Sequence, residues 1–330
     1  MLERKIVKIA ASVICTTLLL QQVWSQEQER RFQFTEPHLG TLVTVTCYNT
    51  DSTAMARMAD SAFALMENLN LVYSDYDEQS EVVTLNRARH RGNVQISTDL
   101  ARLLIIAERM TAETRGAFDP YLGRITHLWK SAFRKNRWPG KRRIRRALRR
   151  SGIEKLSLAE QGDMLAYRRK GIEIDLGGIG KGYIGDRVAQ FLDEQGLTRY
   201  LIDLGGDLIA GDPPPDADGW RVALPVGDPI LLVRSAVATS GTTYQYLVHQ
   251  GRTYSHLIDP ATGYGLGGKV TSTVVASSGA EADALASALP FLSDDLRQLI
   301  FNVDKRAYQI NKADGRMQMS EDMPTILIAN

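Results

Sequence analysis

The chain has 330 residues, of which 44% are hydrophobic and 24% are charged, both ordinary values for a globular protein. These values exclude a wholly disordered chain, a collagen and a polytopic membrane protein. Lys and Arg total 40 against 38 Asp and Glu, so the formal net charge of +2 does not indicate a polyanionic partner. The two cysteines, Cys15 and Cys47, are too few for a disulfide scaffold or an all-cysteine zinc site.

The first 25 residues have the layout of a secretory signal peptide. Arg4, Lys5 and Lys8 precede an uncharged run over 9–20, and Ser25 offers a small residue for cleavage. The run is shorter than the ~20 residues that a membrane-spanning helix needs, although an uncleaved anchor is the alternative. We therefore expect a signal peptide at 1–25 and one domain at 26–330. The expected location is the periplasm or the extracytoplasmic face of a bacterial inner membrane.

Apolar spacing along the rest of the chain predicts a mixture of strands and helices. Strands are predicted over 41–48, 172–176, 200–204, 220–224, 270–276 and 307–310, and helices over 51–72, 99–111, 185–195 and 281–289. Gly196 is predicted to cap the helix over 185–195. The elements alternate without a strict βαβ rhythm, which favours the α+β class.

Two short sequences occur twice. Ile-Asp-Leu-Gly-Gly stands at 174–178 and again at 202–206, and Asp-Pro-x-x-Gly stands at 119–123 and at 259–263. The first pair is compatible with strand ends on either side of one helix, and the second with turns that begin at proline. Repeated turn chemistry within one domain explains both pairs without a duplicated domain.

The segment 130–150 holds 11 Lys or Arg residues and no acidic residue. Such a segment is usually a solvated surface helix, and it could also face an anionic lipid or an acidic partner. No aromatic pattern or nucleic-acid motif accompanies it, so we do not expect nucleic acid as a partner.

The stretch 175–182, Asp-Leu-Gly-Gly-Ile-Gly-Lys-Gly, follows a predicted strand and opens a helix. Glycines let a backbone approach a ligand closely, and a helix N-terminus attracts phosphate. Lys181 could add a direct charge. The spacing matches neither the dinucleotide fingerprint nor the Walker loop, so a phosphate cradle and a tight structural turn both remain open.

Two further places carry groups suited to chemistry. Asp283 and Ser287 are four residues apart, so both lie on one face of a predicted helix, and hard oxygens of this kind suit Mg²⁺. A polar stripe on a helix is the plainer interpretation. His256 and Asp259 flank a predicted tight turn, where a histidine could orient phosphate, move a proton or serve only the structure.

Taken in order, eight short motifs over residues 38–292 resemble the ApbE family, the FAD:protein FMN transferases. The motifs are Leu39-Gly-Thr41; Ser74-Asp-Tyr76 with Ser80-Glu-Val82 and Leu85-Asn86; Gly116-Ala-Phe-Asp-Pro120; the glycine stretch through Tyr183; Asp203-Leu-Gly-Gly-Asp207; Thr239-Ser-Gly241; Tyr254 to Pro260 with Thr262-Gly263; and Ala282 to Ser287.

The resemblance implies a compact, two-lobed, T-fold-like α+β domain with the flavin site between its lobes. It also implies a magnesium-dependent enzyme that attaches the FMN half of FAD to a Thr or Ser hydroxyl of an acceptor protein and releases AMP. The acceptor is expected to be a subunit of a membrane redox complex or an extracytosolic flavoprotein.

The resemblance also assigns roles to residues. Asp283, Ser287 and the carbonyl of Gly178 are the implied metal ligands. His256, Asp259 and Lys181 are the implied catalytic candidates. The implied FAD-binding residues are Leu39, Tyr76, Ala117, Phe118, Asp119, Asp175, Lys181, His256 and Leu257.

Three positions depart from the family pattern. Leu39 stands where Met is usual, Ser287 where Thr is usual, and Ala261 where Arg is common. None of these changes removes a type of metal ligand, so we expect an active transferase. The alternatives are a metal-dependent FAD pyrophosphatase, which would release free FMN and AMP, and a periplasmic protein that binds FAD without turnover.

Overall fold

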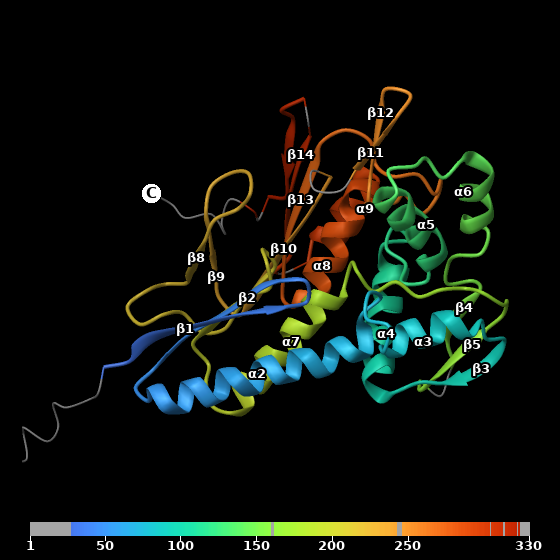
Figure 1. The fold of residues 1–330 in the computed structure, drawn as a ribbon. Helices are drawn as coiled ribbons and strands as arrows, with labels where there is room; N and C mark the ends of the chain where they lie inside the picture. Colours follow the sequence, from blue (N-terminus) through green and yellow to red (C-terminus); the bar gives the residue numbers. More distant parts are fainter. Residues whose placement is uncertain are drawn as a thin grey trace, which may run out of the picture.

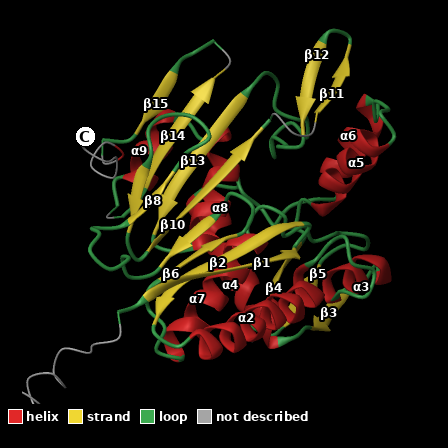
Figure 2. Ribbon diagram, turned by 60° about the vertical axis from the view of Figure 1, so that its left-hand side comes forward, coloured by secondary structure: helices red, strands yellow, loops and turns green. Residues whose placement is uncertain are grey.

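The computed structural model describes residues 28–159, 162–242, 246–303, 305–312, 314–321 and 323. The predicted signal peptide lies outside these residues. The central element is an eight-stranded sheet with the strand order β1-β2-β6-β7-β10-β13-β14-β15, and every neighbouring pair is antiparallel (Figure 2). The strands are β1 Arg30–His38, β2 Thr41–Asn49, β6 Tyr200–Asp203, β7 Leu208–Ala210, β10 Ser235–Gly241, β13 Val270–Ala276, β14 Ala307–Lys312 and β15 Met317–Met319.

Helices cover one face of this sheet. Three of them, α2 (Ser52–Tyr73), α7 (Gly180–Glu194) and α8 (Gly279–Ala288), pack directly on its strands (Figure 1). Alternate residues of β10 and β13 separate the two faces: Ala236 and Val274 join the large core beneath the helices, whereas Val237 and Val275 face the other way. That second face is covered by the hairpin of β8 (Trp220–Val222) and β9 (Ile230–Leu232).

Two smaller regions flank the helical layer. One contains α3 (Glu81–Ala88), α4 (Thr98–Glu113) and the three-stranded sheet of β3 (Gly92–Gln95), β5 (Met164–Tyr167) and β4 (Leu156–Leu158). The other contains α5 (Gly123–Arg134), α6 (Lys141–Leu148) and the hairpin of β11 (Tyr246–His249) and β12 (Arg252–Ser255) (Figure 1). A 3₁₀ turn, Leu289–Phe291, and α9, Asp294–Phe301, complete the elements.

Aromatic packing holds α5 and α6 against the β11–β12 hairpin. Trp138 stacks on His249 with ring centroids 4.3 Å apart, and Trp129 stacks on Tyr254 at 5.8 Å. The indole nitrogen of Trp129 donates to the carbonyl of Gly263, 2.9 Å away, so this buried polar group is satisfied. The basic segment 130–150 therefore contributes to α5 and α6, and the apolar side of both helices packs in this aromatic core.

Most predicted elements are confirmed with shifted ends, and the α+β class is confirmed. The strand predicted over 172–176 is wrong. This stretch has no regular secondary structure, and its backbone is bonded to a side chain and to a loop: the Asn86 side chain accepts from the nitrogen of Ile174 at 2.7 Å, and the Pro120 carbonyl accepts from that of Asp175 at 2.8 Å. Its alternating apolar residues, Ile172, Ile174 and Leu176, are buried, but no strand within the described part of the chain pairs with this stretch. Among the described residues, no helix is long and apolar enough to cross a membrane.

The helix predicted from 185 begins five residues earlier, at Gly180, because glycines let its first turn approach α8. A Cβ atom on Gly182 would overlap the carbonyl oxygen of Gly279, and one on Gly279 would lie 2.5 Å from the carbonyl oxygen of Gly182. Asp186 of α7 accepts from the nitrogens of Gly279 and Ala280, 2.6 and 2.9 Å away, and so caps α8. The two helix starts are thus locked together at backbone distance.

We expect Gly182→Ala to lower the free energy of unfolding by about 2–3 kcal/mol, because the new methyl group meets rigid backbone. Gly180→Ala is the matched control, since its Cβ would approach only the Leu176 side chain, at 3.9 Å. Urea unfolding measures both variants. Equal stability of the two variants would contradict the close approach of α7 and α8.

Candidate active site

The two Asp-Leu-Gly-Gly sequences form turns, one before α7 and one at the end of β6, in which the aspartate accepts from glycine nitrogens. Asp175 accepts from the nitrogen of Gly177 at 2.8 Å, and Asp203 accepts from those of Gly205 and Gly206 at 2.9 and 2.8 Å. Gly205 and Gly206 have φ angles of +79° and +104°, which glycine adopts without strain. Gly177 and Gly178 do not adopt positive φ, so the two sequences share the bond from a glycine nitrogen to the aspartate but not the backbone conformation of the turn.

The first turn faces α8. A Cβ atom on Gly178 would lie 3.1 Å from the Oγ of Ser287 and 3.5 Å from the Phe118 ring. The Ser287 hydroxyl also lies 3.1 Å from that of Ser240 on β10. The structure therefore brings together three residues, Gly178, Phe118 and Ser287, that are far apart in the sequence.

Asp283 lies one helical turn before Ser287 and is only 4% exposed. It accepts from the nitrogen of Gly182 at 3.3 Å. Burial and the neighbouring charge of Asp207 raise the pKa of Asp283 to about 7. A cation bound here would favour its ionised form.

Lys181 is the basic group of this region, and its ammonium pairs with Asp207. Burial lowers the pKa of Lys181, but the charges of Asp283 and Asp207 outweigh that effect and raise it above the ordinary value. Asp207 is itself buried and accepts from the nitrogen of Thr239 at 3.2 Å. The site thus combines two buried carboxylates with one lysine, an arrangement that can take a further cation.

A second cluster lies at the start of the glycine turn. Asp75, His127 and Asp175 each offer a ligand atom, and these atoms lie within 4.8 Å of one another, so the group is a possible metal site. Lys130 of α5 bonds to Asp75 and lies 2.9 Å from Asp175. In this arrangement the lysine ammonium already contacts both carboxylates, whose side chains are 5% and 9% exposed.

Neighbouring charges and hydrogen bonds set the pKa values of Asp175 and His127. Burial alone would raise the pKa of Asp175, but Lys130 and His127 lower it well below the ordinary value. Burial lowers the pKa of His127, but hydrogen bonds to Asp75 and Glu173 outweigh it and raise that pKa to about 9. Asp175 and His127 are therefore both charged at neutral pH.

A cavity of about 600 Å³ opens beside this network. Its lining residues are Asp75, Tyr76, His127, Lys130, Ser131, Phe133, Arg134 and Tyr246. Tyr76 is 76% exposed, and the Lys130 ammonium lies 5.1 Å from the centroid of its ring. The cavity thus joins the loop after α2 to α5 and β11, and it presents an aromatic face to a ligand.

Leu39 lies at the tip of the β1–β2 hairpin with φ +53°, followed by Gly40 at +73°. The Thr41 side chain next to it packs so closely on Gly205 that a Cβ atom there would overlap it. The hairpin tip is therefore adjacent to the second glycine turn.

Ala117 and Asp119 lie in the loop before α5. Ala117 packs against the main core, and the Asp119 carboxylate accepts from the nitrogens of Tyr121 and Ile153, 2.8 and 2.9 Å away. Asp119 thus fixes its own loop.

His256, Leu257 and Asp259 follow β12. Leu257 is buried, and its carbonyl accepts from the nitrogen of Leu266 at 2.7 Å. Asp259 accepts from the nitrogen of Ala261 at 2.9 Å and from the hydroxyl of Thr262 at 2.7 Å, so its carboxylate organises the turn.

Sequence reasoning missed Asp207, Asp75, His127 and Lys130 as members of these clusters. Asp207 and Asp75 stood inside recognised motifs, so only their roles were overlooked. In the sequence Lys130 belongs to the basic segment 130–150. Only the structure shows that it pairs with Asp75 and Asp175.

Comparison with known proteins gives one consistent result. The sequence model of the ApbE family matches residues 39–307. An FAD:protein FMN transferase of Vibrio cholerae serotype O1 is 30% identical over 279 residues, covering 78% of this chain and 82% of the relative. One from Klebsiella pneumoniae is 28% identical over 258 residues, covering 76% and 78%.

Solved structures agree. The crystal structure of the ApbE protein from Thermotoga maritima has a TM-score of 0.81 and 28% identity, covering 91% of this chain and 100% of that one. The flavin transferase ApbE from Vibrio cholerae has a TM-score of 0.79 and 25% identity, with the same coverage. The mixed α+β fold is therefore shared.

Replacement of Lys130 tests the ion network. We expect Lys130→Met to lower the free energy of unfolding by about 2–4 kcal/mol, because two buried carboxylates lose their cation. Lys135→Met, an exposed position on the same segment, is the control and should change stability little. Chemical unfolding measures both, and equal effects would show that Lys130 does not hold the network.

The pH dependence of stability tests His127. Its folded pKa of about 9 exceeds the unfolded value near 6.5, so its contribution is complete below pH 6.5 and is lost as the pH rises through 9. The loss amounts to at most about 3 kcal/mol. His127→Gln should flatten this part of the unfolding free-energy profile, and His90→Gln should not. If the unfolding free energy of His127→Gln fell with pH as steeply as that of the wild type, His127 would not be the group responsible.

Proposed function

The chain belongs to the ApbE family, and we propose that it is an FAD:protein FMN transferase. In this proposal the enzyme moves the FMN half of FAD, through its phosphate, to a Thr or Ser hydroxyl of an exported or membrane redox protein and releases AMP. The observation that carries the proposal is the convergence of Gly178, Lys181, Asp283 and Ser287 where α7 meets α8.

Mg²⁺ fits the oxygen donors of this region. We assign Asp283, Ser287 and the carbonyl of Gly178 as the protein ligands, because the Gly178 turn and the Ser287 hydroxyl adjoin and Asp283 lies one helical turn away. The buried carboxylate of Asp283, with its raised pKa, is suited to a cation. When bound, the ion would neutralise charge on the pyrophosphate oxygens.

The Asp75, His127 and Asp175 group is the less suitable magnesium site. Lys130 contacts both of its carboxylates, so a divalent cation would have to displace a buried ammonium. A histidine ligand also suits a softer metal better than Mg²⁺. We therefore propose that this group positions the glycine turn and the Tyr76 loop.

In this proposal FAD lies between two lobes, the sheet with its covering helices and the region of α5, α6 and β11–β12. The cavity beside Tyr76 supports this placement, since the loop that follows α2 lines it together with α5 and β11. Tyr76 is available to stack on a flat ring. Leu39, Ala117, Phe118, Asp119 and Leu257 would complete the binding surface as the family pattern implies.

The reaction needs a nucleophile, a leaving group and charge stabilisation. The acceptor hydroxyl oxygen bonds to the FMN-side phosphorus, and the bond from that phosphorus to the bridging oxygen breaks, so its electron pair leaves with AMP. Lys181, held by Asp207, is suited to stabilise the growing negative charge. His256 and Asp259 are the candidates for accepting the hydroxyl proton.

The proposed location follows from the N-terminal sequence. The basic start, the short uncharged run and Ser25 support export to the periplasmic side of the inner membrane. There the enzyme would meet exported or membrane-bound acceptors.

The proposed activity is tested by mass spectrometry of a candidate exported acceptor after incubation with the mature protein, FAD and Mg²⁺. We expect a mass gain of one FMN phosphoester on a Thr or Ser, absent when EDTA is present. AMP and free FMN without a modified acceptor would favour a pyrophosphatase. Bound FAD without any turnover would favour a binding protein.

Asp283→Asn tests the metal assignment without relying on activity alone. The variant should lose at least about 10–100-fold in affinity for Mn²⁺, measured by electron paramagnetic resonance, because a charged ligand becomes neutral and changes to the groups behind ligands already cost that much. FMN transfer should fall at least as far. Asp294→Asn, at an 82% exposed carboxylate on α9, is the matched control. Normal Mn²⁺ affinity in Asp283→Asn would move the metal elsewhere.

A further inference from the structure

A second hollow of about 320 Å³ lies between α5 and α6. Its lining residues are Arg124, His127, Leu128, Arg143, Arg146, Ala147, Arg150 and Glu173. Arg143 and Arg146 lie three residues apart on one face of α6, and Arg150 lies two residues beyond its end; all three line the same hollow. We call this hollow the arginine groove.

The positive charge of the groove is largely uncompensated. Glu173 is the acid in its lining, and that carboxylate is already bonded to Arg124 and lies 2.8 Å from His127. Within the part of the chain that the structure describes, no ion pair joins Arg143, Arg146 or Arg150 to a carboxylate. The guanidiniums therefore repel one another.

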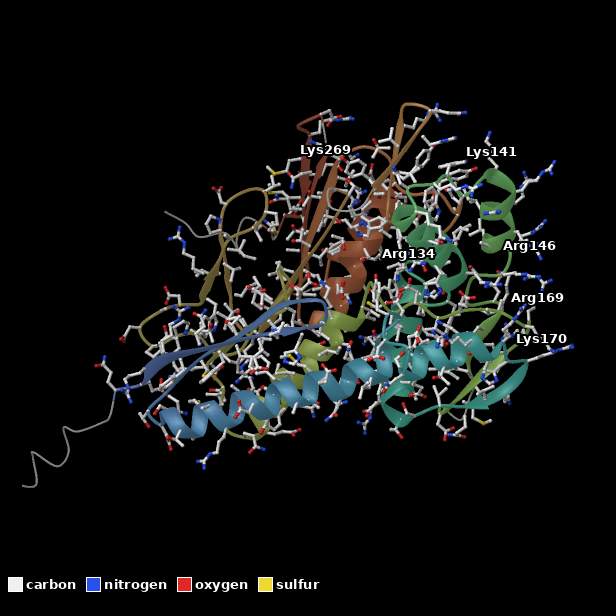
Figure 3. All side chains as sticks on the ribbon, in the orientation of Figure 1. Arg134, Lys141, Arg146, Arg169, Lys170 and Lys269 are labelled. Atoms are coloured by element: carbon white, nitrogen blue, oxygen red, sulfur yellow. The ribbon has the colours of Figure 1, made fainter. Side chains whose placement is uncertain are left out.

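The surroundings add to this charge. The pKa of Arg150 is lowered, chiefly by the positive charge of Arg146. Burial and the charges of Arg124, Arg89 and Arg169 lower it further. Figure 3 shows Lys141, Arg146, Arg169 and Lys170 along one edge of the molecule, beside α6 and the end of β5. An anionic partner would thus gain from several cations together.

The groove adjoins the proposed flavin cavity. His127 lines both hollows, and its ring contacts Glu173 on one side and Asp75 on the other. A chain segment lying in the groove would therefore place its neighbouring residues near Tyr76 and Lys130. This continuity favours a macromolecular occupant that extends from the groove into the cavity.

This inference rests on the proposed function: we propose that the arginine groove docks a carboxylate-rich segment of the acceptor protein, so that the part of the acceptor carrying the Thr or Ser lies on the side of the flavin cavity. Guanidinium groups bind carboxylates through paired hydrogen bonds, and a concave row of them fits side chains on a peptide. Asp or Glu residues beside the modified Thr or Ser are the expected recognition feature.

An anionic membrane is the less suitable occupant. Membrane-surface helices usually carry large apolar side chains on the face that meets the lipid. Among the described residues of 123–150, none is an exposed large hydrophobic residue. Ile144 of α6 is buried in the same cluster as Trp129 and Trp138. The surface is charged and hollow, which suits individual carboxylates more than a flat bilayer.

The test uses a fluorescein-labelled oligo-glutamate peptide, with an oligo-glutamine peptide as its neutral counterpart, and the full mature protein without FAD. The triple variant R143E/R146E/R150E reverses the charge at three positions that line the groove. The variant R142E/R145E/R149E changes the same number of charges on exposed positions of the same segment that do not line the groove. R143Q/R146Q/R150Q provides a milder version, and thermal melting verifies that each variant folds.

We expect the groove variants to bind the acidic peptide at least about tenfold more weakly, since three cation–carboxylate contacts are lost. The control should lose about twofold or less at physiological ionic strength, because its side chains do not line the groove and exposed charges are partly screened by salt. The neutral peptide should bind to none of them. Equal losses in groove and control variants, or no binding of the acidic peptide, would overturn the proposal.

Vesicles of phosphatidylglycerol provide the competing probe. Groove-dependent binding to these vesicles, with no binding of the peptide, would overturn the proposal in favour of a membrane surface. Because the peptide is tested without FAD, its result is independent of the transferase assay. With an identified acceptor, the groove variants should raise KM for that acceptor far more than the control does, and an unchanged KM would contradict docking in the groove.

Discussion

The contact between the starts of α7 and α8 is the constraint on which the candidate site depends. Gly182 and Gly279 bring two backbones together at a distance that no side chain would permit, and Asp186 fixes the approach by capping α8. This contact sets the glycine turn of one helix against Asp283 and Ser287 of the other. Because both helices also pack on the sheet, the site is built on rigid elements rather than on loops.

Charge pairing supports the site on both sides of the glycine turn. Lys181 pairs with Asp207 beside α8, and Lys130 joins Asp75 to Asp175 at the start of the turn. Buried carboxylates are costly unless cations accompany them, so each lysine stabilises the geometry around it. The two clusters differ in one respect. Two basic residues, Lys130 and His127, lie against Asp75 and Asp175, whereas Asp283 and Asp207 share a single lysine and can accept a further cation.

The sequence predicted those features that are local. Apolar periodicity located most helices and strands, and of the two Asp-Leu-Gly-Gly sequences only the second follows a strand, β6, as predicted. It failed where burial arose without regular pairing, as at 172–176, and where glycine served helix packing, so that α7 began five residues earlier than predicted. Lys130 could not be separated from the basic run by sequence, because its role depends on Asp75, 55 positions away in the chain.

The central claim is that α7 and α8 build the metal-dependent FAD site. Anomalous diffraction from crystals of the mature protein soaked with Mn²⁺ and FAD tests it most directly. The account predicts a manganese peak beside Asp283, Ser287 and the Gly178 carbonyl, with the flavin next to Tyr76. A manganese peak between Asp75, His127 and Asp175, with Lys130 displaced, would contradict it.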